Sequence, residues 1–172
     1  KKITTVPIDV HLMVNHPEDI IPMCLEAGAD IISFHPETAN NKIFRLLNQI
    51  KDAGKKCGVV LNPATPAESI AEYAHLLDKV TVMSVDPGYA GQKFIPESLN
   101  KIRKLINMRK NNGYRYLTEI DGSCNEQTFG QIAESGVDVF IVGTSGLFSL
   151  HEDVSQAWDR MIEIFQRETV AA

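Results

Sequence analysis

Short apolar runs rich in β-branched residues alternate along this chain with longer segments of helical character. The runs that predict strands are Ile8–Met13, Asp30–Phe34, Lys56–Leu61, Lys79–Ser84, Tyr116–Ile120 and Val137–Val142. Most of these runs are apolar throughout, which is typical of parallel strands that are covered on both faces. The pattern therefore predicts an α/β fold of βα units in series, joined by right-handed crossovers.

The segments between the predicted strands carry residues that begin and end helices. Pro17 and Pro96 stand where helices should begin, and Thr65-Pro66-Ala67-Glu68 and Ser149-Leu150-His151-Glu152 both match the capping box. Four glycines, Gly28, Gly54, Gly113 and Gly136, stand where helices should end ahead of the next strand.

Two architectures accommodate this series of βα units: an open doubly wound sheet and a (β/α)8 barrel. No Gly-x-Gly-x-x-Gly sequence follows the first predicted strand, which weakens the doubly wound, dinucleotide-binding alternative. A barrel needs eight units, and the 172 residues offer six predicted strands. We therefore expect a (β/α)8 TIM barrel whose first two βα units are absent from the sequence, with residues 1–172 forming a single domain.

Composition and charge exclude several classes of function. The chain is 44% hydrophobic and 23% charged, as expected for a soluble globular protein. Its net charge of −5 argues against a nucleic-acid partner, and no apolar run approaches the roughly 20 residues of a membrane span. The basic residues between Lys101 and Lys110 are best explained as the solvated face of one helix. Cys24, Cys57 and Cys124 form no Cys-x-x-Cys motif, which predicts reduced thiols and a cytoplasmic location.

Polar residues gather where the predicted strands end, which is where barrels carry their catalytic groups. His11 and Met13 share one face of the first strand, and Glu119 and Asp121 share one face of the fifth. An aspartate at the end of an apolar strand is costly unless a cation or hydrogen bonds hold it. His11 and Asp121 could supply two ligands of a divalent metal ion, although the sequence contains no obvious remaining ligands.

Glycine-containing loops follow the last three predicted strands and suggest a phosphate site. Gly88 and Gly91 can leave backbone N–H groups directed into open space. Gly122-Ser123 and Gly143-Thr144-Ser145-Gly146 follow the last two strands, where barrels commonly hold a phosphate. Capture by backbone groups needs no basic patch, which suits an acidic protein.

Several of these motifs together resemble the ribulose-phosphate 3-epimerase family, in the same order and spacing over essentially the whole chain. The motifs are Asp9-Val10-His11-Leu12-Met13-Val14, Leu61-Asn62-Pro63-Ala64-Thr65-Pro66, the segment from Val85 to Ile95, and Glu119-Ile120-Asp121-Gly122-Ser123. Three further segments, 35–38, 121–125 and 140–148, look more like the D-allulose-6-phosphate 3-epimerases of this family. The pentulose enzymes usually read Asp-Gly-Gly where this chain has Asp121-Gly122-Ser123.

The resemblance implies a role for each matching residue. His11 would bind the metal and contact the substrate, and Asp121 would be both a metal ligand and a catalytic acid/base. Met13 and Met83 would line the pocket beside the metal. The remaining positions would cover the substrate (Gly88, Tyr89, Ala90 and Gly91) or hold its phosphate (Gly122, Ser123, Gly143, Thr144 and Ser145). The cofactor would be one divalent ion (Zn, Mn, Co or Fe), and the protein would be a homo-oligomer.

The implied reaction converts D-allulose 6-phosphate to D-fructose 6-phosphate. Two carboxylates would exchange the C3 proton on opposite faces of a metal-bound enediolate. The family's first two strands carry the second catalytic Asp and the other metal ligands, and these are absent from the sequence.

Three alternatives remain. The first is a ribulose-5-phosphate 3-epimerase that gives xylulose 5-phosphate. The second is a sugar-phosphate decarboxylase or aldolase, which is disfavoured because no predicted strand end carries a lysine. The third is a non-catalytic phosphate-binding relative.

Overall fold

Six parallel strands lie side by side in the order in which they occur along the chain. The computed structural model describes residues 4–170. Its strands are β1 (Asp9–Leu12), β2 (Ile31–Phe34), β3 (Lys56–Leu61), β4 (Lys79–Met83), β5 (Leu117–Asp121) and β6 (Val139–Ile141). Each strand pairs in parallel with its neighbour in sequence, so every connection is a crossover that carries helical segments.

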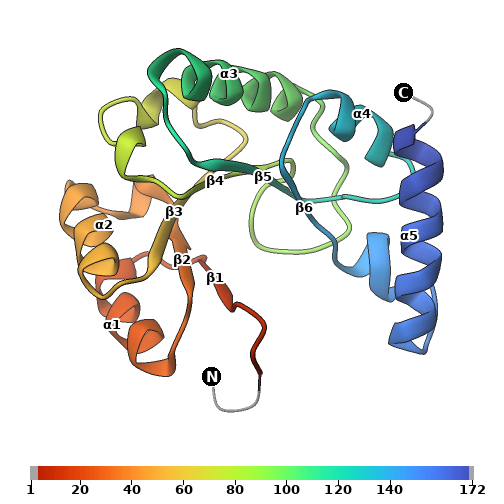
Figure 1. The fold of residues 1–172 in the computed structure, drawn as a ribbon, viewed down its shortest axis with the longest axis horizontal. Helices are drawn as coiled ribbons and strands as arrows, with labels where there is room; N and C mark the ends of the chain where they lie inside the picture. Colours follow the sequence, from red (N-terminus) through yellow and green to blue (C-terminus); the bar gives the residue numbers. More distant parts are fainter. Residues whose placement is uncertain (1–3, 171–172) are drawn as a thin grey trace.

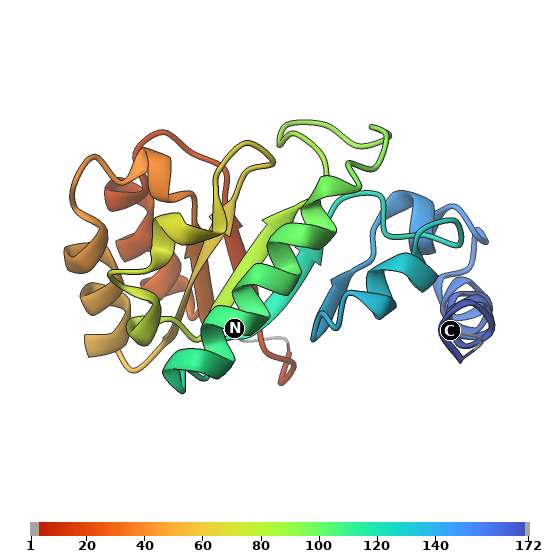
Figure 2. The same cartoon turned by 90° about the horizontal axis from the view of Figure 1, so that it is seen from above.

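The helices lie on the outer side of the curled sheet (Figure 1, Figure 2). The longer ones are α1 (Pro17–Ala27), α2 (Ile43–Asp52), α3 (Glu97–Asn112), α4 (Phe129–Glu134) and α5 (Val154–Val170). Four short helical turns, η1 (Pro36–Thr38), η2 (Ala67–Ile70), η3 (Ala74–Leu76) and η4 (Thr144–Phe148), complete the connections. No helix within residues 4–170 has the length and apolar character needed to cross a lipid bilayer.

The strand order distinguishes between the two predicted architectures. A doubly wound sheet reverses its strand order at a switch point, whereas this sheet runs from β1 to β6 without a reversal. The predicted α/β fold is confirmed as a curled, all-parallel, six-stranded sheet. A closed ring of eight units is not seen, because β1 and β6 lie at opposite ends of the strand order and are not paired within the described residues.

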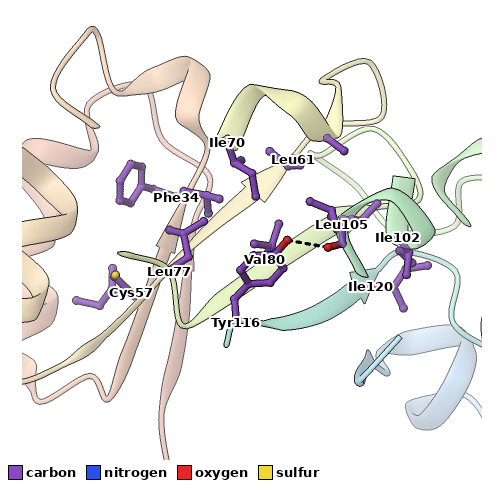
Figure 3. Packing of buried hydrophobic residues seen from close by; sticks show 14 of the residues in the cluster. Phe34, Cys57, Leu61, Ile70, Leu77, Val80, Ile102, Leu105, Tyr116 and Ile120 are labelled. Carbon is purple, nitrogen blue, oxygen red and sulfur yellow. Dashed lines mark hydrogen bonds between the residues drawn. The ribbon is translucent and has the colours of Figure 1, made fainter. Parts of the chain in front are cut away.

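Alternate residues of the strands face opposite sides of the sheet, and the two sides differ in chemistry. The outward side packs beneath the helices in one hydrophobic core, whose members include Phe34, Leu61, Val80, Ile102 and Ile120 (Figure 3). Tyr116 lies in the same core, and its hydroxyl donates to the Leu105 carbonyl over 2.7 Å. The inward side instead carries polar residues: Asp9, His11, Ser33, Lys79, Thr81, Glu119 and Asp121.

The predicted strands agree with the observed ones within two residues at each end, and Lys56–Leu61 matches fully. Helix α1 begins at Pro17 and α3 directly after Pro96. The glycines predicted to end helices all have positive φ, namely Gly28 (88°), Gly54 (71°), Gly113 (68°) and Gly136 (79°).

Both predicted capping boxes are wrong. Segment 67–70 is a short 3-10 turn. The Thr65 hydroxyl does not cap this turn and instead donates to the Glu37 carboxylate. Helix α5 begins at Val154, and Asp153 caps it by accepting the Gln156 N–H over 3.0 Å. In the first case a competing partner took the capping hydroxyl, and in the second the helix begins beyond the motif.

The three cysteines are free thiols, as predicted. Cys57 and Cys124 are buried, and burial is the main cause that raises the pKa of Cys57 to about 11. The prediction of a solvated basic face on α3 is wrong for Lys101, which is 8% exposed. Its ammonium donates to the carbonyls of Asn62 (2.5 Å) and Pro63 (2.9 Å), so it fastens the end of β3 to α3.

Candidate active site

A cleft of about 380 Å³ lies at the carboxyl-terminal ends of strands β4, β5 and β6. Its walls are the loop after β4, the loop after β5 and the segment that follows β6. Every predicted site residue except His11 lines it: Met13, Met83, Gly88, Tyr89, Ala90, Gly91, Asp121, Gly122, Ser123, Gly143, Thr144 and Ser145. This is the end of a parallel sheet at which α/β proteins bind their ligands.

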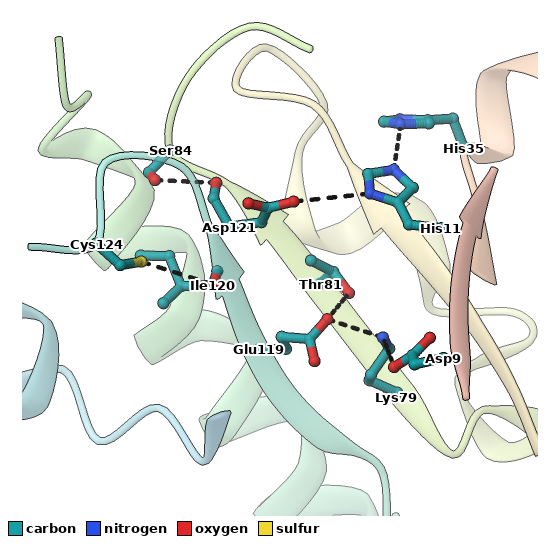
Figure 4. A network of polar contacts seen from close by, with 10 residues as sticks. All are labelled: Asp9, His11, His35, Lys79, Thr81, Ser84, Glu119, Ile120, Asp121 and Cys124. Atoms are coloured by element: carbon teal, nitrogen blue, oxygen red, sulfur yellow. Dashed lines mark hydrogen bonds and ion pairs between the residues drawn. The ribbon is translucent and has the colours of Figure 1, made fainter. Parts of the chain in front are cut away.

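His11 and Asp121 approach each other across the inner side of the sheet (Figure 4). The distance from His11 Nδ1 to Asp121 Oδ2 is 3.7 Å, and the side chains are 17% and 24% exposed. Strands β1 and β5 are separated by three other strands in the sheet, so the approach depends on the curl of the sheet. The structure therefore meets the geometric requirement for the two side chains to act together.

The second ring nitrogen of His11 faces His35, which precedes η1. The two Nε2 atoms are 2.9 Å apart, so one ring donates and the other accepts. Burial, and next the charge of His11, lower the pKa of His35, which favours its neutral form. A neutral imidazole donates from one ring nitrogen and accepts at the other, so His35 can take either role. Where His35 accepts from a neutral His11, the His11 proton lies on Nε2 and the Nδ1 lone pair is directed toward Asp121.

These two side chains fit part of a metal site. One nitrogen and one oxygen 3.7 Å apart can both bind an ion at the usual ligand distances of about 2.0–2.2 Å. Within residues 4–170, however, no group of three or more His, Cys, Asp or Glu side chains is arranged to hold a metal. His11 and Asp121 would therefore fill two ligand positions, and no further His, Cys, Asp or Glu of the described residues completes the set.

Ser84, fully buried at the end of β4, fixes the backbone that carries Asp121. Its N–H donates to the Asp121 carbonyl over 2.8 Å, and its hydroxyl contacts the carbonyls of Asp121 (3.0 Å) and Gly122 (2.5 Å). Gly122 has φ 118°, and a Cβ there would lie 2.7 Å from Val85 Cγ2. The tight turn after β5 therefore requires glycine for packing as well as for conformation.

Ser123 connects two walls of the cleft. Its backbone has φ 50°, and its hydroxyl donates to the Gln92 carbonyl over 2.5 Å. The Gln92 side-chain amide in turn donates to the carbonyls of Asp86 (2.5 Å) and Tyr89 (3.0 Å). These contacts order the segment that we call the cleft loop, residues 86–92, and they show the Ser123 hydroxyl already engaged.

The segment after β6 forms the third wall. Gly143, Thr144 and Ser145 are exposed at the cleft, and the Asn125 amide donates to the Ser145 hydroxyl over 3.2 Å. A Cβ at Gly146 would lie only 2.0 Å from the Cys124 carbonyl oxygen, so this segment can approach the β5 loop only with glycine there. None of the described residues that line the cleft is Lys or Arg, so an anion would be held by backbone N–H groups and hydroxyls.

The sequence assigned no role to several residues that line or support the cleft, although it placed His35 at the end of the second predicted strand. Gln92 and His35 are the most important, because Gln92 orders the cleft loop and His35 contacts His11. Gln92 directly follows Gly91 in the glycine-containing loop, and this position was the only available signal. Cys124 also lines the cleft, but burial, and next the charge of Asp121, raise the pKa of its thiol to about 12.

Comparison with known sequences gives a consistent result. A profile described as the ribulose-phosphate 3 epimerase family matches residues 1–148. Ribulose-phosphate 3-epimerase of Buchnera aphidicola is 44% identical over 144 residues, which are 84% of this chain and 62% of that protein. The Aquifex aeolicus protein of the same name is 42% identical over 156 residues (91% and 69%), and the Escherichia coli K12 protein 43% over 141 residues (82% and 62%). The chain thus spans roughly three fifths to two thirds of the length of these relatives.

Solved structures with a similar fold are more distant in sequence. A mutant tryptophan synthase alpha-subunit of Pyrococcus furiosus superposes with a TM-score of 0.66 at 16% identity, over 97% of this chain and 68% of that chain. The 3-hexulose-6-phosphate synthase of Salmonella typhimurium gives 0.59 at 19% identity, over 90% and 69%. At such identities the likeness concerns the fold alone, and it is a likeness to TIM-barrel proteins.

Proposed function

The chain belongs to the ribulose-phosphate 3-epimerase family, and we propose from this premise that it takes part in the epimerisation of a ketose phosphate at C3. The observation that carries the proposal is the approach of His11 and Asp121 to 3.7 Å beside a cleft with glycine-containing walls. A carboxylate base beside a candidate metal ligand suits the removal of a proton next to a carbonyl, because a bound ion could stabilise the charge that develops.

Asp121 is the proposed acid/base. Its backbone is held through Ser84, and its carboxylate lines the cleft, where it can remove the C3 proton from one face of the sugar or return it. Epimerisation requires proton exchange on both faces, so a second acid/base must act opposite Asp121. The described residues that line the cleft include one other carboxylate, Asp86, on the exposed cleft loop, and its position does not assign it this role.

His11 and Asp121 would hold the divalent ion on which members of this family generally depend. When bound, the ion supplies Lewis-acid stabilisation of the negative charge that develops as the C3 proton leaves. His35 would fix the His11 ring by accepting a hydrogen bond from its Nε2–H, as partners of metal-binding histidines commonly do. Met83, which is 2% exposed at the floor, would keep water from the reacting carbons.

The substrate phosphate is proposed to lie against Gly122, Ser123, Gly143, Thr144 and Ser145. Backbone N–H groups and hydroxyls provide neutral donors for an anion, which suits a cleft without basic lining residues. The cleft loop would cover the bound sugar. Its order through Gln92 and Ser123 supports a defined closed position.

Two substrates are consistent with this site. We prefer D-allulose 6-phosphate, with D-fructose 6-phosphate as the product, because the Asp121-Gly122-Ser123 motif departs from the Asp-Gly-Gly of the pentulose enzymes. The names of the relatives favour ribulose 5-phosphate, with xylulose 5-phosphate as the product. Assays of the full-length protein with both sugar phosphates decide between them. A higher kcat/KM for ribulose 5-phosphate would contradict our preference but not the 3-epimerase proposal.

The role of Asp121 is tested with Asp121→Asn in the full-length protein. We expect epimerisation, followed as exchange of the C3 proton with deuterated solvent, to fall by a factor of about 100 or more. Binding of the sugar phosphate, measured by calorimetry, should survive because the phosphate contacts are separate. A near-normal exchange rate would remove Asp121 from the mechanism.

A further inference from the structure

A cluster of charges around a buried lysine lies on the inner side of the sheet, one level below His11 and Asp121 (Figure 4). Its centre is Lys79, the first residue of β4, which is 5% exposed. The Lys79 ammonium donates to Glu119 Oε1 over 2.8 Å and also forms an ion pair with Asp9 Oδ2. Thr81 donates its hydroxyl proton to the same Glu119 oxygen over 2.7 Å. Two carboxylates, one of the buried Glu119 and one of the partly exposed Asp9, therefore converge on one buried ammonium.

The cluster involves the same two strands as the proposed metal ligands. Asp9 and His11 lie on the same face of β1, two residues apart, and Glu119 and Asp121 do the same on β5. Two residues of a strand span about 6.6 Å, so the two pairs form successive levels of the interior. At the upper level His11 meets Asp121, and at the lower level Lys79 joins Asp9 to Glu119.

The space that Lys79 crosses is kept open by small residues. Ser33 on β2 and Gly58 on β3 lie between β1 and β4 on the inner side. A Cβ at Gly58 would lie 2.5 Å from Ser33 Oγ and 3.4 Å from Lys79 Cβ. Because Lys79 lines neither the cleft nor its loops, it does not reach a bound substrate.

We propose that Lys79 is a positioning residue, whose ammonium holds β1 and β5 at the separation that lets His11 and Asp121 bind one divalent cation. Strands β1 and β5 are not hydrogen-bonded to each other, so their distance depends on the curl of the three strands between them and on contacts across the interior. Without the ammonium, the buried Glu119 carboxylate would lose its countercharge and would face the Asp9 carboxylate, and their repulsion would drive the strands apart. This inference rests on the proposed function, since it concerns the same cation.

The test measures binding of Mn²⁺ by calorimetry to the metal-free, full-length protein. Lys79→Met removes the charge and keeps a long apolar side chain. We expect it to weaken Mn²⁺ binding about 10- to 100-fold, as loss of a residue that supports metal ligands typically does. Saturating Mn²⁺ should restore much of the epimerase rate, whereas a general structural defect would lower the rate at every Mn²⁺ concentration.

Lys101→Met is the matched control, because Lys101 is also a buried lysine but donates to carbonyls at the end of β3. It should bind Mn²⁺ like the wild type. If Lys79→Met does not fold, Glu119→Gln weakens the same ion pair more mildly and should reduce affinity about 3- to 10-fold.

Wild-type affinity in Lys79→Met, or in Glu119→Gln where the first variant does not fold, would overturn the inference and leave the proposed function intact. Equal losses in Lys79→Met and Lys101→Met would also overturn it. Failure of the wild-type protein to bind Mn²⁺ would overturn the metal role itself and the inference with it.

Discussion

The Ser123 backbone adopts φ 50°, a left-handed conformation in which a side chain costs about 1 kcal/mol relative to glycine. In this conformation the Ser123 hydroxyl donates a hydrogen bond to the Gln92 carbonyl. A buried or partly buried hydrogen bond contributes about 1 kcal/mol, which is enough to offset the strain. The hydrogen bond that orders the cleft loop therefore offsets the backbone strain at Ser123.

Replacing Ser123 separates these two effects. Ser123→Gly removes both the strain and the hydrogen bond, so we expect little change in the free energy of unfolding. Ser123→Ala keeps the strain and loses the bond, so it should destabilise the protein by about 1 kcal/mol. In both variants, amides of the cleft loop should exchange faster with deuterated solvent and KM for the sugar phosphate should rise. Unchanged exchange in both would show that Ser123 does not order the loop.

Gly146 and Gly143 lie in the same segment after β6 but differ in the space around them. A Cβ at Gly146 would lie 2.0 Å from the Cys124 carbonyl oxygen, whereas a Cβ at Gly143 would meet nothing within 4 Å. We expect Gly146→Ala to destabilise the protein by about 1–3 kcal/mol through overpacking and Gly143→Ala to change stability far less. Urea denaturation measures both. Equal stabilities of the two variants would mean that the β5 and β6 segments do not approach as described.

At the scale of elements, Asp138 joins α3, β5 and the turn before β6. Its Oδ2 accepts the Thr118 N–H (2.7 Å) and hydroxyl (2.8 Å) and contacts the Arg109 guanidinium over 2.5 Å. Burial acts to raise the pKa of Asp138, but the hydrogen bonds from Arg109 and Thr118 and the guanidinium charge outweigh it. The pKa is consequently lowered below its ordinary value.

This shift predicts a dependence of stability on pH. A carboxyl with a lowered folded-state pKa stabilises the protein above its unfolded pKa of about 3.9, and the contribution is lost as the pH falls through the folded value. Asp138→Asn should therefore lower the free energy of unfolding at pH 7 by about 1–3 kcal/mol. The difference in the free energy of unfolding between this variant and the wild type should shrink as the pH falls below about 4. Urea denaturation across this range measures it, and a constant difference would contradict the assignment.

The predicted elements were reliable where many residues contributed to one pattern. The apolar runs located all six strands, and glycines with positive φ marked helix ends. The capping boxes were wrong because each motif depends on one side chain, and Thr65 found a different partner in Glu37. The burial of Lys101 was also missed, since its partners are backbone carbonyls that lie distant in the sequence.

At the scale of the whole molecule, the curl of the sheet assembles the candidate site. His11 and Asp121 come from strands that are not neighbours, and only a curved sheet places them 3.7 Å apart. The strand ends could be predicted from the sequence, because each lies at the end of an apolar run. The contacts of His35, Gln92 and Lys79 could not, since they depend on how the curled sheet and its loops bring distant residues together.

The most direct test of the central claim is a crystal structure of the full-length protein with Mn²⁺, in which anomalous scattering locates the ion. We predict one peak in contact with both His11 Nδ1 and Asp121 Oδ2, at about 2.0–2.3 Å from each. A peak that contacts neither side chain, or no peak in the cleft at saturating Mn²⁺, would contradict the claim.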